Sequence, residues 1–300
     1  MEERLSVILV NYNGRDYNDN CIKSIFCSTV WEKLEVVIVD NASTDESLTE
    51  LKNNWGEDER VHILPLDRNY GFSKANNEGI RWALERGSKY FLLLNNDTEI
   101  EPDAIERMLA DYRKTESIVV PKVLYADRPD IIWCAGGSFS GIIKKACQRG
   151  LNEADRGQYD ESGRCVFANG CCMLLSDKII EKSGFLDERF FLYYEDTEYS
   201  LRAAKKGIPI RYCAEARVYH KVNGSTKGNQ RPENAYYITR NWLLCNKIHM
   251  NRGRFCLFCI YFLLNRLAWT VIWSIQGKGD MAKAVCQGVK DFKSGRYGKY

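Results

Sequence analysis

Two acidic segments carry the side chains that binding and activating an anionic substrate would need. Residues 95–97 (Asn-Asn-Asp) follow an apolar run, and the pair Glu195-Asp196 follows five largely aromatic residues. A carboxylate at the end of a strand can hold a divalent cation beside a diphosphate. Apolar neighbours raise the pKa of a carboxyl group and help it accept a proton from a hydroxyl. The pattern therefore predicts a cation ligand at Asp97 and a general base at Asp196 or Glu195.

The same acids also have plainer structural interpretations. Asp97 could be an N-cap or the start of an Asx turn. Glu195 and Asp196 could cap the helix that follows them. In that helix Glu198 and Arg202 have the spacing of an i,i+4 ion pair. The structural and chemical roles are compatible, because the start of a helix is a common place for a base.

His220 is a further candidate ligand. It ends a short strand-like run, residues 216–220, and precedes a hydroxyl-rich segment, residues 223–226. A lone histidine is most often a structural residue, but this position also suits a metal ligand beside a phosphate.

The elements that would position these residues alternate between strand and helix. Apolar, β-branched runs at 5–10, 34–39, 61–64 and 90–94 are too short for helices. Helical stretches lie between them, near 16–28, 45–54 and 73–86, and Ser43 with Glu46 has the spacing of a capping box. Such alternation predicts a mostly parallel sheet flanked by helices, with ligands at the carboxyl ends of the strands.

Polar residues follow each of these strands. Asp40 could accept hydrogen bonds from a ribose or a base, and Tyr12 could stack on the base. No GxGxxG follows the first strand, so a bound diphosphate would need a cation instead of a glycine cradle. This absence also argues against a nucleotide-binding oxidoreductase. Regular alternation fades after residue 118, and we expect 118–225 to be a second half of mixed strand direction that faces a second substrate, with a helix at 195–206 and strands at 208–212 and 216–220.

The charge is unevenly distributed along the chain. Residues 241–300 hold ten Lys or Arg against two Asp, a balance of +8, so the other 240 residues carry −5 of the net +3. A basic tail on an acidic body suggests an anionic surface as partner. The acidic body and the lack of RNA-binding motifs argue against nucleic acid. An early strand in place of a signal peptide, together with twelve cysteines, predicts reduced thiols in the cytoplasm.

Several motifs in order resemble family 2 glycosyltransferases of the GT-A fold, and most of all the rhamnosyltransferase-like branch of bacterial cell-surface polysaccharide assembly. The resemblance covers roughly residues 4–245. The motifs are residues 7–13 (VILVNYN), 36–45 (VVIVDNASTD), 69–79 (NYGFSKANNEG), 92–97 (LLLNND), 168–175 (ANGCCMLL), 184–191 (GFLDERFF) and 194–202 (YEDTEYSLR).

The resemblance implies an inverting hexosyl- or rhamnosyltransferase. It would move a sugar from a UDP- or dTDP-linked donor to a hydroxyl of a glycan or lipid-linked acceptor, with Mg²⁺ or Mn²⁺ as cofactor. Asp97 and His220 would hold the metal, and Asp196, in preference to Glu195, would be the base. Residues 1–117 would bind the nucleotide and 118–245 the acceptor. The nucleotide-binding residues would be Asn11, Tyr12, Asn13, Asp40, Asn69, Gly71, Phe72, Asn76, Asn95 and Asn96.

One position departs from the family pattern. The first acid of the family's DxD motif is Asn95 here, which leaves a single carboxylate and makes the metal more dependent on His220. A catalytically silent module that binds a nucleotide sugar or a glycan is therefore an alternative. It predicts nucleotide binding without turnover.

Residues 246–300 form a helical, basic appendage whose segment 255–275 is the most apolar of the chain. Its length suits a membrane-spanning helix, but Asn265 and Arg266 lie at its middle. Arg266, Thr270 and Ser274 draw a polar stripe along one face. A helix in the plane of the membrane is favoured, at the inner face of the cell membrane. Docking on the domain, a homodimer interface and spanning are the alternatives.

Overall fold

The computed structural model describes residues 4–300 except 31, 33, 142, 144 and 222–230. The segment 223–226, noted above after His220, lies outside the described residues. In chain order the elements are β1 (Leu5–Asn11), α1 (Asn18–Phe26), β2 (Leu34–Asp40), α2 (Ser47–Trp55), β3 (Val61–Pro65), α3 (Phe72–Glu85), β4 (Tyr90–Asn95), β5 (Thr98–Ile100), α4 (Ala104–Thr115), β6 (Ile118–Tyr125), β7 (Ile132–Ala135), β8 (Gly137–Ser140), β9 (Lys145–Gln148), β10 (Gly163–Cys165), β11 (Cys172–Ser176), α5 (Asp177–Ser183), α6 (Glu195–Lys205), β12 (Ile210–His220), α7 (Pro232–His249), α8 (Arg252–Ile275) and α9 (Gly279–Ser294).

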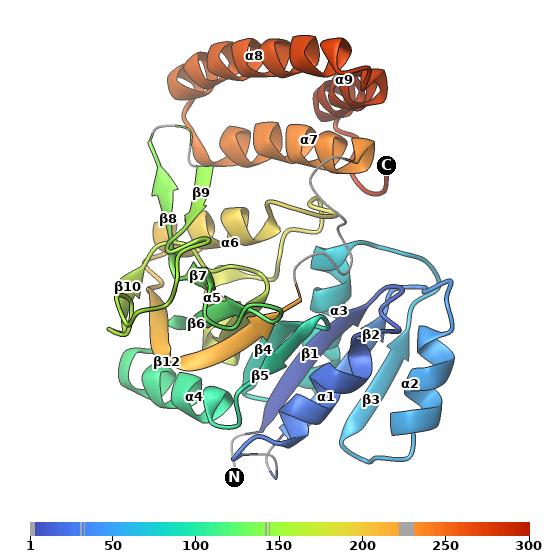
Figure 1. Cartoon of the computed structure of the whole chain (residues 1–300), viewed down its shortest axis with the longest axis vertical. Helices are drawn as coiled ribbons and strands as arrows, with labels where there is room; N and C mark the ends of the chain where they lie inside the picture. The colour runs from blue at the N-terminus through green and yellow to red at the C-terminus, as the bar shows by residue number, and fades with distance from the viewer. Residues whose placement is uncertain (1–3, 31, 33, 142, 144, 222–230) are drawn as a thin grey trace.

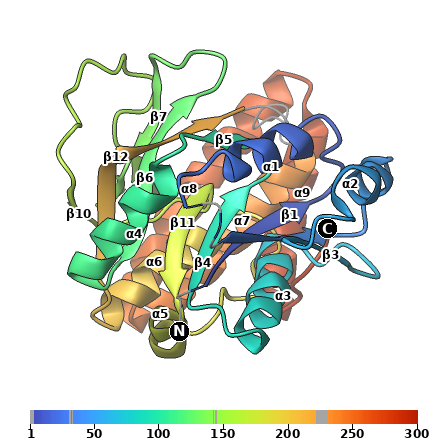
Figure 2. The ribbon, with the colours of Figure 1, turned by 90° about the horizontal axis from the view of Figure 1, so that it is seen from below.

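The N-terminal half is the parallel sheet that the apolar runs predict. β1 pairs in parallel with β2 on one side and with β4 on the other, and β3 extends the sheet beyond β2. β1, β2 and β4 are almost entirely buried because helices cover both faces, with α1 and α2 on one face and α3 on the other (Figure 2). The carboxyl ends of β1, β2 and β4 therefore open at one edge.

The second half mixes strand directions, as expected. β11 lies antiparallel between β4 and β6, and β12 runs parallel to β6. The two strands predicted at 208–212 and 216–220 are one strand, β12, whose register shifts between Cys213 and Arg217. The bulge breaks the local pattern without ending the strand. The short β5 pairs with the end of β12 and sets Thr98 opposite His220.

The capping box predicted at Ser43 is wrong. α2 begins at Ser47, and the Ser43 hydroxyl instead accepts a hydrogen bond from the backbone N–H of Asn13 at 3.0 Å. Asp45 accepts from the N–H of Ser47 at 3.0 Å. The Ser43 side chain thus joins the loop after β2 to the loop after β1.

Helices α7, α8 and α9 form a layer at one end of the molecule, and α8 lies across the outside of it (Figure 1). α9 packs along α7, and the expected division at residue 245 falls inside α7. α8 buries Phe258 and Phe262 against Trp242 of α7. It is the one helix in the described part of the chain that is long and apolar enough to cross a membrane, and little of it is buried.

The polar stripe of α8 faces the protein at Arg266 and Thr270. The Arg266 guanidinium lies 5.3 Å from the centre of the Trp242 ring, and burial lowers the pKa of this arginine. Thr270 is half-buried on the same side, whereas Ser274 is exposed. The outward face instead carries exposed large apolar side chains: Leu257, Ile260, Leu263, Leu264, Leu267, Val271, Ile272 and Ile275.

Candidate active site

The ends of the parallel strands are joined by one buried network of side chains. Asn11, fully buried, donates to Asp40 Oδ1 at 2.7 Å and to Ser47 Oγ at 2.9 Å. Its own Oδ1 accepts from Asn18 at 2.9 Å, and Asn96 donates to Asn18 Oδ1 at 2.7 Å. The loops after β1, β2 and β4 therefore converge, as their positions at the strand ends predict.

Two predicted nucleotide-binding residues line the outer side of this network. Tyr12 is 40% exposed, so its ring is free to stack on a planar ligand. Asn13 has a positive φ of 56° and accepts from the N–H of Thr44 at 2.7 Å. Asp40 is only 1% exposed, and its oxygens accept from Asn11 and from the N–H of Ser43. Asp40 is therefore already engaged in shaping the loops.

Residues 69–76 join the nucleotide side to the loop before the second acidic pair. Asn69 accepts from the N–H of Gly71 at 2.9 Å, and Asn76 donates to the carbonyl of Phe72 at 2.9 Å. The N–H of Phe72 donates to the carbonyl of Phe191 at 2.7 Å. Gly71 has φ +85°, and a Cβ there would lie 2.3 Å from that same carbonyl. Only glycine fits this approach.

Asp97 and His220 are brought together by the pairing of β5 with β12. His220 Nε2 lies 3.2 Å from Asp97 Oδ1, and both side chains are largely buried. The N–H of Lys221 donates to the carbonyl of Asp97 at 2.8 Å. Burial works against protonation of His220, but Cys171 and Asp97 outweigh burial and raise the pKa of the imidazole to about 10. The shift favours the protonated form of His220.

The surroundings of this pair leave polar atoms unused. Asn95 Oδ1 and His220 Nδ1 are buried and have no hydrogen-bond partner among the described residues. Within the same part of the chain no cluster of three His, Cys, Asp or Glu could hold a metal. The pair therefore brings together one carboxylate and one imidazole.

Glu195 and Asp196, the first residues of α6, differ in their surroundings. Asp196 is half-buried and accepts from the N–H groups of Gly170 at 3.2 Å and Thr197 at 2.6 Å. Glu195 is buried, and its Oε2 has no partner. Burial and the neighbouring Asp196 raise the pKa of Glu195 to about 8, and burial also raises the pKa of Asp196. Because the Asp196 carboxylate accepts from Gly170 and Thr197, whereas Glu195 has only its own backbone N–H as a donor, the proton belongs on Glu195.

Residues 170–171 connect the two acidic centres, a link that the sequence did not predict. The N–H of Gly170 reaches Asp196, while the carbonyl of Cys171 accepts from the N–H of Asn95 at 2.9 Å. The Cys171 thiol interacts with the His220 ring. The only sequence signal was membership of these residues in the motif at 168–175. Trp133 was also missed, and its ring lies edge-on to His220 with 4.6 Å between centroids.

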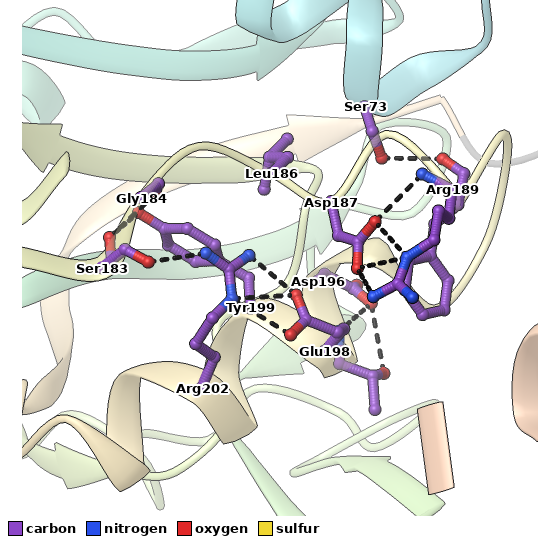
Figure 3. A network of polar contacts seen from close by, with 12 residues as sticks. Ser73, Ser183, Gly184, Leu186, Asp187, Arg189, Asp196, Glu198, Tyr199 and Arg202 are labelled. Carbon is purple, nitrogen blue, oxygen red and sulfur yellow. Dashed lines mark hydrogen bonds and ion pairs between the residues drawn. The ribbon is translucent and has the colours of Figure 1, made fainter. Parts of the chain in front are cut away.

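The remainder of α6 is anchored by a second network, shown in Figure 3. The Arg202 guanidinium contacts both Glu198 and Ser183. Its Nη2 lies 2.7 Å from Glu198 Oε2, and its Nη1 donates to the carbonyl of Ser183 at 2.7 Å. The i,i+4 pair predicted from the sequence is confirmed. On the other side of the same loop the Ser73 hydroxyl donates to the carbonyl of Phe190 at 2.7 Å.

Comparisons with known proteins agree with this arrangement. The sequence profile described as glycosyl transferase family 2 matches residues 6–184. The low-salt glycan biosynthesis hexosyltransferase Agl10 of Haloferax volcanii is 30% identical over 240 residues, covering 79% of this chain and 73% of that protein. The dTDP-rhamnosyl transferase RfbF of Shigella flexneri is 27% identical over 258 residues, covering 83% and 82%.

Solved structures share the fold. GalNAc-T7, crystallised with UDP, GalNAc and Mn²⁺, superposes with a TM-score of 0.64 at 17% identity, covering 82% of this chain and 48% of its own. S. aureus TarS 1-349 in complex with UDP-GlcNAc superposes with a TM-score of 0.58 at 16% identity, covering 96% and 80%.

The mostly parallel sheet with its loops gathered at one edge is a GT-A fold, and the protein is a nucleotide-sugar-dependent glycosyltransferase. The chain belongs to glycosyl transferase family 2.

Proposed function

We propose that this enzyme transfers a hexose or deoxyhexose, with inversion, from a UDP- or dTDP-linked donor to a hydroxyl of a glycan or lipid-linked acceptor. The names of the two relatives, a glycan biosynthesis hexosyltransferase and a dTDP-rhamnosyl transferase, support this class of donor and product. The product would be a cell-surface polysaccharide or its precursor.

One observation carries the proposal: residues 170–171 bridge the Asp97–His220 pair and Asp196. An inverting transfer needs a base on the acceptor side and charge neutralisation on the leaving-group side, close enough to act on one anomeric carbon. The bridge supports both requirements at one site. Phe72 and Gly170 are also neighbours, since a Cβ on Gly170 would lie 3.6 Å from the Phe72 ring.

Asp97 and His220 fit the requirements of a Mg²⁺ or Mn²⁺ ion. Mg²⁺ commonly takes one or two protein ligands and completes its shell with substrate phosphate and water. Asp97 and His220 would be the protein ligands of such an ion, since their Oδ1 and Nε2 atoms lie together, 3.2 Å apart. When bound, the cation would neutralise charge on the departing nucleoside diphosphate.

The chain's own residues would divide the remaining work. Tyr12 would stack on the base. The donor site would be shaped by the other predicted nucleotide-binding residues: Asn11, Asn13, Asp40, Asn69, Gly71, Phe72, Asn76, Asn95 and Asn96. Asp196 would accept the proton of the acceptor hydroxyl, since its carboxylate has hydrogen-bond donors and is more accessible than Glu195. Residues 1–117 would serve the donor and residues 118–245 the acceptor, and the acceptor part would continue to the end of α7 at His249.

The outward face of α8 would lie in the plane of an anionic membrane at the cytoplasmic side. Its exposed leucines and isoleucines would enter the acyl boundary, and Arg252 and Arg254 at the start of the helix are exposed to meet lipid phosphates. Because Arg266 is turned toward Trp242, charge is absent from the middle of the outer face of α8. Such attachment would bring the enzyme to a lipid-linked acceptor.

A donor panel tests the activity. UDP- and dTDP-linked sugars are incubated with the protein and Mn²⁺, and release of nucleoside diphosphate and binding of the nucleotide are both measured. The enzyme releases nucleoside diphosphate from at least one donor, faster with acceptor glycan present. Nucleotide binding without release from any donor, with or without acceptor, would instead favour a silent binding module.

A further inference from the structure

The chain turns sharply just before the acidic pair. Tyr193 and Tyr194 both have left-handed backbones, with φ +68° and +74°, and neither is glycine. Each such residue costs roughly 1–2 kcal/mol. Tyr194 precedes α6 and makes no side-chain cap hydrogen bond. A strained turn of this kind persists only where its surroundings hold it in place.

Among the described residues, the hydrogen bonds from the donor side reach the first part of this loop, up to Phe191. Asn77 exchanges hydrogen bonds with the backbone of Leu186 at 2.9 and 3.0 Å. The carbonyls of Phe190 and Phe191 accept from Ser73 and Phe72. These contacts end at Phe191, before the strained residues begin.

The next two carbonyls are held from α7. Asn241, fully buried, donates from Nδ2 to the carbonyls of Leu192 and Tyr193, both at 2.8 Å. Its Oδ1 accepts from Nε of the equally buried Arg240 at 2.9 Å. Because Arg240 occupies the oxygen of the amide, the NH₂ group of Asn241 must face the turn.

Arg240 is itself fixed in place. Its Nη1 donates to the carbonyl of Gly298 at 2.8 Å and to the Tyr236 hydroxyl at 3.2 Å. Tyr237 stacks on Phe191 with 5.2 Å between ring centroids. The tail after α9 and the face of α7 therefore support the side chain that holds the turn.

We propose that Asn241, oriented by Arg240, is a positioning residue that sets the Asp196 carboxylate at the angle required to accept a proton. The proposal rests on the proposed role of Asp196 as the base. Asn241 lies beyond residues 6–184, the part of the chain that the family profile matches. Its amide hydrogen-bonds to the carbonyls of Leu192 and Tyr193, and it acts by fixing these two residues, which lead into Tyr194 and α6.

The test compares Asn241→Asp with Asn246→Ala. The aspartate keeps the shape of the side chain and can pair with Arg240, but it has no N–H to donate to the turn. Asn246 is a matched control on the same helix, since it is 2% exposed and donates to the carbonyl of Trp242 at 2.9 Å. Each rate is divided by the fraction of the protein molecules in the sample that bind nucleoside diphosphate, so that misfolded molecules do not lower the measured kcat.

Asn241→Asp should lower kcat by about 100-fold with KM for the donor within about twofold, the cost expected when a catalytic group is misplaced. Asn246→Ala should keep kcat within about twofold, whatever its melting temperature. Wild-type kcat in Asn241→Asp, or an equal loss in Asn246→Ala, overturns the proposal.

Asn241→Ala serves as a second variant with the same expectation if the aspartate fails to bind nucleotide. Asp196→Asn separates the two claims. If Asp196→Asn keeps wild-type turnover, the assigned base is wrong, whereas an inactive Asp196→Asn beside a fully active Asn241→Asp removes only the role of Asn241.

Discussion

His220 Nε2 lies 3.2 Å from Asp97 Oδ1, although one residue ends β12 and the other follows β4. The short antiparallel pairing of β5 with β12 creates this proximity. With the pKa of His220 raised to about 10, the imidazole carries a proton that a bound cation must displace. A cation held by both side chains would therefore replace the proton that His220 carries beside Asp97.

The first prediction concerns the pH dependence of metal affinity. One proton leaves His220 when the cation binds. At pH values below the pKa of about 10, the affinity for Mn²⁺ should therefore increase about tenfold for each unit by which the pH is raised. Titration of Mn²⁺ between pH 6.5 and 8.5, with nucleoside diphosphate present, measures this slope. His220→Gln should flatten the slope, and Asp97→Ala should weaken Mn²⁺ binding at every pH. An unchanged titration in both variants would remove the pair from the metal site.

A second prediction concerns Glu195 and stability. Its folded-state pKa of about 8 lies above the ordinary 4.5, so the native state binds more protons than the unfolded state between these values. Stability is therefore lost as pH rises through this window. Glu195→Gln removes that loss. The difference in melting temperature, variant minus wild type, should therefore be larger at pH 8.5 than at pH 5 by about 2–4 °C or more. A difference that is the same at both pH values contradicts the assignment of the proton to Glu195.

The third prediction concerns the contact between Gly71 and Phe191. Gly71 and Gly184 have nearly the same backbone, φ +85° and ψ 176° against φ +82° and ψ 175°. A Cβ on Gly184 would meet only the end of the Arg202 side chain at 3.3 Å, whereas on Gly71 it would meet a backbone carbonyl. Both alanine variants should lose about 1–3 kcal/mol from backbone strain. Gly71→Ala should lose about 1–3 kcal/mol more in urea unfolding from overpacking. Equal losses would mean that the loop yields freely.

A fourth prediction concerns the outer face of α8. Leu263→Glu and Leu267→Glu, at side chains 61% and 63% exposed, should abolish sedimentation with phosphatidylserine vesicles without lowering the melting temperature. Val166→Glu is the control, because Val166 is also an exposed apolar side chain (48%) but lies outside α8. This variant should sediment as wild type does. Substitution is preferable to deletion of residues 251–300, because α9 packs on α7. If the leucine variants instead turn a dimer into a monomer and leave sedimentation unchanged, a second copy covers this face.

The elements of the donor half follow from local patterns. Runs such as 34–39 are apolar, β-branched and short, so they predict buried parallel strands, and the loops at their ends then had to converge. Sequence periodicity and the rules of parallel sheets are sufficient for these features. The joint role of Asp97 and His220 followed from the family resemblance instead, because their proximity depends on the antiparallel pairing of β5 with β12.

The remaining features depend on contacts between distant segments. Ser43 has the spacing of a capping residue, but its hydroxyl accepts from Asn13 because the loops after β1 and β2 are adjacent. Neither the left-handed turn at Tyr193 nor its hydrogen bond to Asn241 has a local signature, since tyrosine is a poor choice for positive φ. The polar stripe on α8 was visible, but only the position of Trp242 shows that Arg266 faces inward.

The most direct test of the proposed mechanism is the turnover of Asp196→Asn under conditions where its nucleotide binding matches that of wild type. The asparagine keeps the size of the side chain and can still accept from the N–H of Gly170, but it cannot take a proton from the acceptor. Transfer should fall by about 100- to 10,000-fold while the Kd for nucleoside diphosphate stays within about twofold. Turnover at the wild-type rate with that affinity intact would contradict the role of Asp196 as the base.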